Sequence, residues 1–107
     1  MTTHHDVCFG CGQANLFGIQ LEEGRFFVKL DHQGARGQAH GGILATALQE
    51  AMELAARAPV KRLTVELLRP APVGAFVEVE VGPDGATATA RVEGEVVAEA
   101  AADFAVG

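Results

Sequence analysis

Hydrophobic residues recur with a helical period across residues 42–58. At 100° per residue they cover a broad arc, made of Ile43, Leu44, Ala47, Leu48, Ala51, Met52, Leu54 and Ala55. The narrow remainder is polar and holds Thr46, Gln49, Glu50, Glu53 and Arg57. Pro59 is expected to end the helix. An apolar arc this wide predicts a helix that is enclosed over most of its circumference.

After the predicted helix, hydrophobic and polar residues alternate along the chain. In the segment Val60–Arg69, the side chains of Leu63, Val65 and Leu67 share one face. Segments 75–81, 86–92 and 96–106 also read as strands, with glycine-containing turns at 82–85 and 93–95. We expect residues 60–106 to form consecutive antiparallel strands in a meander. Before the helix, residues 25–31 are expected to pair with 17–23, and residues 1–18 to form an N-terminal arm or loop.

This order of elements predicts one α+β domain over residues 1–107, with one helix against an antiparallel sheet of five to six strands. One helix covers only part of one sheet face, and the edge strands of a monomer stay open. Both problems would be solved by a homodimer that joins sheets or packs helices side by side. The sequence therefore also predicts a homo-oligomer.

Composition narrows the functional classes. The 107 residues are 49% hydrophobic, yet no apolar run approaches the roughly 20 residues of a membrane span. The first residues lack the pattern of a secretion signal, so we expect a soluble cytoplasmic protein. A net charge of −6 argues against a nucleic-acid partner. Four cations within 13 residues form either a local anion-binding patch or solvated helix and strand ends, namely Arg57, Lys61, Arg62 and Arg69.

Cys8 and Cys11 form one Cys-x-x-Cys pair, which is half of a structural zinc site. A second pair is absent; His4 and His5 could complete four ligands, but they lie near the terminus. The pair is therefore a weak metal candidate. A reduced structural turn and a redox pair remain alternatives.

The start of the helix carries the strongest chemical signal. His40, Gly41 and Gly42 stand directly before the apolar period. Bare glycines let a ligand approach N–H groups that have no partner inside the helix, and the helix dipole favours negative charge there. An oxyanion developing from a carbonyl is one such charge. The alternatives are a plain tight turn and a histidine that caps the helix.

Several motifs together resemble the hotdog-fold acyl-CoA thioesterase superfamily, in the branch related to phenylacetate-degradation thioesterases. The likeness is carried by Cys8-Phe9-Gly10-Cys11-Gly12, by His40-Gly41-Gly42-Ile43-Leu44-Ala45-Thr46, by Leu63-Thr64-Val65 with Arg69-Pro70-Ala71-Pro72-Val73-Gly74, and by Gly94-Glu95-Val96-Val97-Ala98-Glu99-Ala100. The resemblance implies a sheet wrapped around a central helix, dimers and often tetramers, and active sites at the dimer interface. It also implies an acyl-CoA substrate and no further cofactor.

In this resemblance the thioester carbonyl lies against the N–H of Gly42 or Gly41, with His40 beside it. The CoA phosphates would need cations, for which Arg57, Lys61, Arg62 and Arg69 are available.

Two positions depart from the family pattern. The acidic residue usual nine positions after the histidine is Gln49 here, and Glu50 lies about 100° further around the helix. A Thr or Ser usual ten residues before the proline is Val60. An amide is no general base, although it can hydrogen-bond a water.

Several interpretations remain open. Glu50 acts as the base, or its carboxylate is simply solvated on the helix surface. Alternatively His40 acts as the base while Gln49 orients water, or the protein binds acyl-CoA without efficient hydrolysis. A further alternative is a zinc-stabilised oligomer whose pocket is vestigial.

Overall fold

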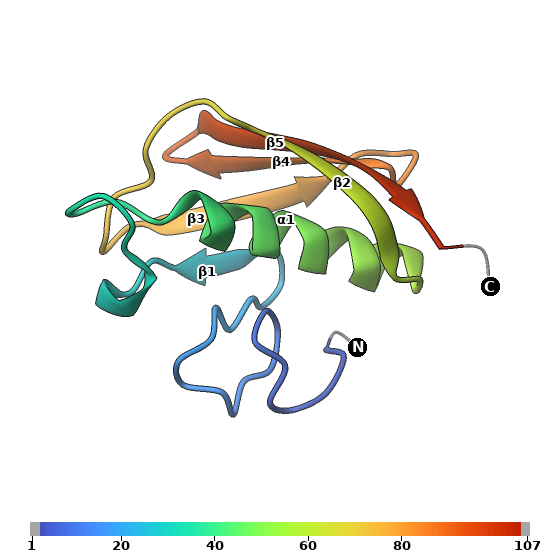
Figure 1. Cartoon of the computed structure of the whole chain (residues 1–107), viewed down its shortest axis with the longest axis horizontal. Helices are drawn as coiled ribbons and strands as arrows, with labels where there is room; N and C mark the ends of the chain where they lie inside the picture. Colours follow the sequence, from blue (N-terminus) through green and yellow to red (C-terminus); the bar gives the residue numbers. More distant parts are fainter. Residues whose placement is uncertain (1–2, 106–107) are drawn as a thin grey trace.

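The computed structural model describes residues 3–105 and consists of one long helix packed against one sheet (Figure 1). In chain order the elements are β1 (Arg25–Phe27), a 3-10 helix η1 (Leu30–His32), α1 (Gly41–Ala56), β2 (Val60–Leu67), β3 (Phe76–Val81), β4 (Thr87–Val92) and β5 (Glu95–Phe104). All strand pairs are antiparallel, in the order β1-β3-β4-β5-β2. The α+β prediction of one helix on a five-strand sheet is confirmed.

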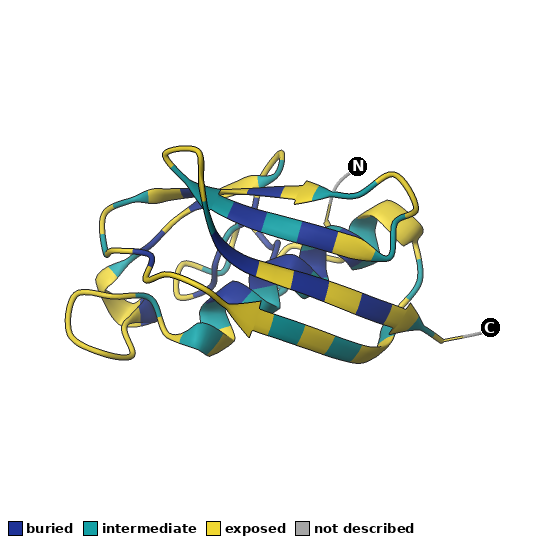
Figure 2. Ribbon diagram, turned by 90° about the horizontal axis from the view of Figure 1, so that it is seen from above, coloured by how far each residue is buried: buried dark blue, intermediate teal, exposed yellow. Residues whose placement is uncertain are grey.

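The core lies between α1 and the face of the sheet toward it. Alternation along the strands places buried and exposed residues on opposite faces, as the banding in Figure 2 shows. On the helix, Leu44, Leu48 and Met52 are buried against this face. The sheet offers mostly small residues to them, namely Val77, Val79, Ala88, Ala90, Val97, Ala98, Ala100 and Ala102. Such small side chains let the helix backbone approach the sheet closely.

The prediction of a continuous meander is wrong for β2. Strands β3, β4 and β5 are consecutive neighbours, but β2 pairs with β5, with Leu63 opposite Ala102. The connection to β3 therefore runs from one side of the sheet toward the other. Pro70 and Pro72 prevent a tight hairpin there, and the connection instead bonds to the loop before α1 through Ala39 N–H and Ala71 C=O (2.8 Å).

The expected pairing of residues 17–23 with 25–31 is also wrong. β1 has only three residues and pairs with β3, with Phe26 opposite Val77. All that remains of the expected hairpin is an isolated bridge between Glu22 and Arg25. Gln20 and Glu23 have φ values of 55° and 51°, and these left-handed conformations interrupt the extended backbone.

The helix ends two residues earlier than expected. Arg57 takes a left-handed conformation with φ 55°, and its N–H bonds to Glu53 C=O at 2.8 Å, which closes the last turn. Strand β5 ends at Phe104. The expected strand end at residue 106 lies outside the described residues.

Residues 3–23 form an arm that lies along α1 without regular secondary structure (Figure 1). Its backbone is tied to itself, with Ile19 N–H bonded to Phe9 C=O (2.7 Å) and Leu21 N–H to Gly10 C=O (2.9 Å). Ile19 and Leu21 join the core. The arm thereby covers part of the polar stripe of the helix.

Within residues 3–105, no helix combines the length and the apolar character needed to cross a bilayer.

Candidate functional site

His40 is the N-cap of α1. Its backbone is extended (φ −61°, ψ 141°), and its Nδ1 accepts a hydrogen bond from Gly42 N–H at 2.8 Å. Its carbonyl accepts from Ile43 N–H at 2.9 Å. The capping interpretation of His40 is thus what this structure shows, and one of the two glycine N–H groups is occupied by it. Among residues 3–105 the other, Gly41 N–H, has no hydrogen-bond partner.

The hydrogen bond to Gly42 also fixes where the imidazole proton is. A neutral imidazole has one donor and one acceptor nitrogen, so an accepting Nδ1 places the proton on Nε2. The His40 side chain is exposed, and Nε2 is free to face a ligand. In this conformation the outward nitrogen is a donor, and Nδ1 acts as a base only when its bond to Gly42 opens.

Buried His32 holds the loop that carries His40. His40 N–H bonds to the His32 carbonyl at 2.8 Å. The His32 ring spans Lys29 N–H, bonded to Nδ1 at 3.1 Å, and the Gly18 carbonyl, 3.3 Å from Nε2. Burial lowers the pKa of His32, and the nearby Lys29 charge acts in the same direction. His32 thereby joins the arm and the start of η1 through its ring, and the loop before α1 through its carbonyl.

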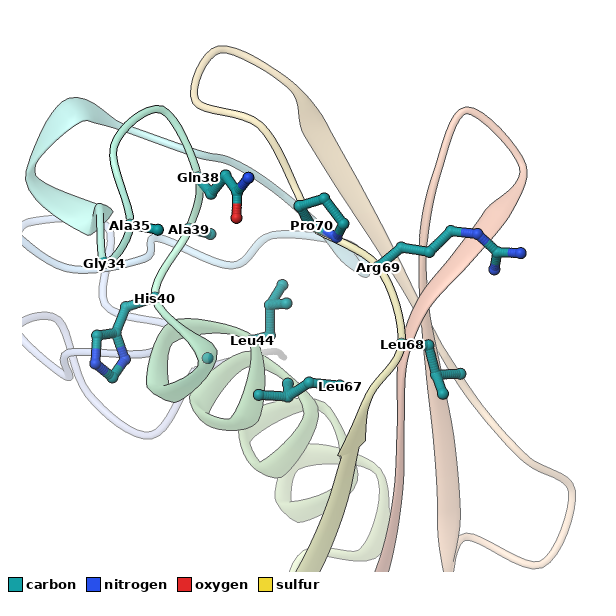
Figure 3. Close-up of a pocket in the computed structure, with 11 residues that line it drawn as sticks. Gly34, Ala35, Gln38, Ala39, His40, Leu44, Leu67, Leu68, Arg69 and Pro70 are labelled. Carbon is teal, nitrogen blue, oxygen red and sulfur yellow. The ribbon is translucent and has the colours of Figure 1, made fainter.

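A pocket of about 470 Å³ opens beside the helix start (Figure 3). Its walls come from the loop before α1, from the first turn of α1, and from the end of β2 with the residues after it. Leu67 and Leu68 are 57% and 48% exposed and supply apolar surface to it. The pocket therefore combines an apolar wall with the free N–H of Gly41, and His40 lies at its edge.

The four predicted cations do not gather at this pocket. Only Arg69 lines it, and its guanidinium donates to Val96 C=O (3.0 Å) and points away from His40 in Figure 3. Arg57 caps the other end of α1, and Lys61 and Arg62 are exposed at the start of β2. Within one chain these three are solvated helix and strand ends.

Gln49 and Glu50 also lie away from His40. Nine or ten helical residues separate them from it, which is about 14 Å along the axis. Gln49 is half-buried, and its Nε2 lies 3.4 Å from Glu53 Oε2. The Glu50 side chain is only 9% exposed, and its Oε1 lies 2.9 Å from His4 Nδ1 and 3.2 Å from Cys8 Sγ. The expectation of a solvated Glu50 is wrong, because the arm covers it.

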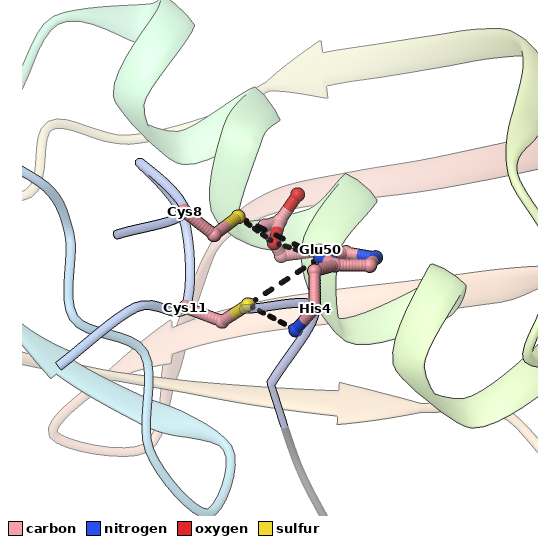
Figure 4. Close-up of side chains that lie close together, drawn as sticks. All are labelled: His4, Cys8, Cys11 and Glu50. Carbon is pink, nitrogen blue, oxygen red and sulfur yellow. Dashed lines mark hydrogen bonds and ion pairs between the residues drawn. The ribbon is translucent and has the colours of Figure 1, made fainter. Parts of the chain in front are cut away.

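Cys8 and Cys11 are free thiols that meet Glu50 and His4 beneath the helix (Figure 4). Burial, together with neighbouring Glu50 and Cys8, raises the pKa of the Cys11 thiol to about 12, although the hydrogen bond from His4 N–H acts in the opposite direction. The Cys-x-x-Cys spacing marks the two thiols from sequence alone. Glu50 lies 39 residues after Cys11, and no local sequence pattern marks it as a neighbour of the two thiols.

A known protein family matches most of the chain. Residues 30–105 match the sequence model of the family described as acyl-CoA thioesterase N-terminal domain. No functionally curated protein shows significant sequence similarity to the chain.

Similar solved structures share the fold. A mutant of the phenylacetic acid degradation protein PaaI from Thermus thermophilus is 29% identical, with a TM-score of 0.65 over 77% of this chain and 82% of that one. A thioesterase superfamily protein is 20% identical, with a TM-score of 0.66 over 76% of this chain, which spans about half (49%) of that protein. A hypothetical thioesterase with coenzyme A from Streptococcus pneumoniae is 16% identical, with a TM-score of 0.63 over 75% of both chains.

Proposed function

Because the chain belongs to the family of acyl-CoA thioesterase N-terminal domains, we propose that it hydrolyses an acyl-CoA thioester to a free acid and CoA. The observation that carries this proposal is the free Gly41 N–H beside His40 at the mouth of an apolar pocket. The coenzyme A present in the similar Streptococcus pneumoniae protein supports the choice of substrate class.

The thioester carbonyl oxygen is proposed to accept from Gly41 N–H. The positive end of the helix dipole then stabilises the negative charge that develops on this oxygen. Gly42 N–H becomes a second donor when the His40 ring turns away, since His40 Nδ1 is its acceptor in the unliganded chain. The substrate carbonyl would thus replace the imidazole as the partner of Gly42.

The same turn of the ring frees Nδ1 to act as the base. In this scheme His40 Nδ1 takes a proton from a water whose oxygen bonds to the carbonyl carbon. The carbon–sulfur bond then breaks, and the CoA sulfur leaves with the proton held by the imidazolium. His40 is favoured over Glu50 for this role because the Glu50 carboxylate is bonded to His4 and Cys8 about 15 Å further along the helix.

Gln49 is proposed to act across a homodimer interface. It lies about 13 Å along the helix from His40 of its own chain, so it would reach the helix start of a second subunit. An amide there would orient the attacking water or the substrate. Arg69 is the proposed phosphate contact at its own pocket, and a second subunit would have to supply Arg57, Lys61 or Arg62.

A protein that binds acyl-CoA without efficient hydrolysis is the second candidate. One observation favours it: of the two residues at the usual acid position and next to it, Gln49 is an amide and Glu50 is engaged by the arm. The pocket beside Gly41 and His40 would then bind acyl-CoA without hydrolysing it.

Hydrolysis across a panel of acyl-CoAs of increasing chain length, with one aromatic member, tests the proposal. Released CoA is followed with a thiol reagent, against a blank without substrate that corrects for Cys8 and Cys11. We expect His40→Ala to lower kcat/KM by roughly 10²- to 10⁴-fold. Exposed His5 in the arm offers the control His5→Ala, which is expected to keep normal turnover.

Calorimetric titration with CoA separates the two candidates. Binding of CoA without turnover of any acyl-CoA would favour the second. Unchanged turnover in His40→Ala would refute the assignment of His40.

A further inference from the structure

Four side chains from the arm and from α1 converge at one point outside the proposed active site. These are His4, Cys8 and Cys11 from the arm and Glu50 from the helix, and their ligand atoms all lie within 4.8 Å of one another (Figure 4). We propose that His4 Nδ1, Cys8 Sγ, Cys11 Sγ and a Glu50 carboxylate oxygen bind one zinc ion, which fastens the arm to the helix.

Four of the six distances between these atoms are close to those of a tetrahedral zinc shell. His4 Nδ1 lies 3.6 Å from Cys8 Sγ and 3.4 Å from Cys11 Sγ. Glu50 Oε1 lies 3.2 Å from Cys8 Sγ and 2.9 Å from His4 Nδ1. Ligands at ordinary zinc bond lengths in a tetrahedron are separated by about 3.4 to 3.8 Å. These four distances differ from that range by at most about half an ångström, and all six lie within 4.8 Å, so shifts of up to about an ångström would complete the shell.

The chemistry of the donors selects zinc among common divalent ions. Two thiolates and an imidazole are soft to borderline ligands, which calcium and magnesium do not favour. Zinc accepts sulfur, nitrogen and a single carboxylate oxygen together. Four protein ligands leave no open position, so the proposed site is structural. Its formation replaces the thiol protons of Cys8 and Cys11 by the metal.

The surroundings hold the ligands as the second shell of a metal site does. His4 Nε2 lies 3.4 Å from Glu53 Oε1, so a metal on Nδ1 would leave the other ring nitrogen to donate to a carboxylate. The opposite oxygen of Glu53 is fixed by Val60 N–H at 2.7 Å. Cys11 Sγ accepts from His4 N–H at 3.2 Å, a bond that stabilises sulfur as a thiolate.

Two glycines let the arm make this approach. A Cβ on Gly10 would overlap the Glu50 side chain, and a Cβ on Gly12 would overlap the backbone of Asp6 and Cys8. Gly12 N–H bonds to Cys8 C=O at 2.8 Å, which closes the turn that brings both sulfurs to the same side. The glycines of the Cys-x-x-Cys-Gly segment thus allow the backbone conformation that places both sulfurs at the proposed zinc position.

Metal content tests the proposal directly. The protein is produced without a polyhistidine tag, purified without chelator, and analysed by inductively coupled plasma mass spectrometry. We expect about one zinc per chain. Replacement by Co²⁺ should give the visible bands of tetrahedral cobalt together with thiolate-to-cobalt charge transfer. Both readouts are independent of thioester hydrolysis, so the zinc site and the proposed activity fail or succeed separately.

Matched variants assign the ligands. Glu50→Gln and Cys8→Ser are expected to lower the zinc content well below one per chain, or to weaken zinc retention against a chromogenic chelator at least tenfold. Glu66→Gln, on exposed β2, should retain zinc fully. If a variant fails to fold, the Co²⁺ spectrum of the unmodified chain still decides. A folded chain that neither contains zinc nor binds added Zn²⁺ or Co²⁺ would overturn the proposal, and so would a disulfide between Cys8 and Cys11 in the freshly purified protein.

Discussion

The two parts of α1 that meet loops are built in opposite ways. At its start, His40 is exposed, Gly41 N–H has no partner among residues 3–105, and apolar side chains line an open pocket. Nine residues after Gly41, Glu50 is buried and hydrogen-bonded, and the arm covers it. A hydrogen-bond donor without a partner and an exposed apolar surface do not stabilise the folded chain. Both can instead contribute to the binding of a ligand. The difference teaches that the start of the helix is left open to a ligand, whereas its middle is committed to a contact within the chain.

The largest expected effect concerns the closed region. A methyl group in Gly10→Ala would overlap Glu50, so the arm must move off the helix. We expect a loss of about 3 kcal/mol in the free energy of unfolding, as for other overpacked sites, measured by urea denaturation. Glu50→Ala removes the overlapped side chain, so Gly10→Ala should cost much less in that background. Equal costs in both backgrounds would show that Gly10 and Glu50 are not in contact.

A smaller effect, on catalysis, is expected at the open end. A Cβ at Gly41 would lie 2.5 Å from Leu67 Cδ1, and exposed Leu67 can move aside. Gly41→Ala should therefore leave the melting temperature nearly unchanged. It should lower kcat/KM at least tenfold, because the methyl stands next to the amide proposed to receive the oxyanion.

The double variant Gly41→Ala, Leu67→Ala separates two causes of that loss. It removes the contact with Leu67 and keeps the methyl at the amide, so we expect activity to stay low. Recovery of normal kcat/KM would mean that Leu67 blocked the pocket and that Gly41 N–H is not the donor.

The sequence predicted most of the local structure of both regions. Helical and alternating periods located α1 and the strands from β2 to β5 within a few residues, and glycines marked the turns between β3, β4 and β5. The family likeness was confirmed by the match over residues 30–105. These features depend on neighbours in sequence, which periodicity and turn chemistry report directly.

Long-range neighbours were not predictable in the same way. The position of β2 beside β5 depends on how the chain crosses the sheet, and nothing in the β2 pattern specifies its partner. Glu50 falls in a polar stripe that reads as solvated, and its burial follows from where the arm folds. Cys8, Cys11 and His4 were recognisable as candidate ligands, but Glu50 as their partner was not.

The smallest expected effect concerns His32, which links the arm to the loop before His40 and so connects the two regions. Its folded pKa lies below the ordinary value near 6.5, because the ring is buried beside Lys29. Below pH 6.5, His32 binds a proton in the unfolded chain but stays neutral in the folded protein until the pH reaches its lower folded pKa. Stability from this group is therefore complete above pH 6.5 and decreases as the pH falls from 6.5 toward the folded pKa.

Unfolding of the unmodified chain and of His32→Gln at pH 7.5 and 5.5 measures this contribution. Every other ionisable group is present in both proteins, so the difference between the pH dependence of the unmodified chain and that of His32→Gln isolates the contribution of His32. We expect the unmodified chain to lose more stability on acidification than the variant. An equal loss would mean that His32 is protonated without cost in the folded state. The ring would then be hydrated, and the arm would be held to the site loop more loosely than the bonds to Lys29 and Gly18 indicate.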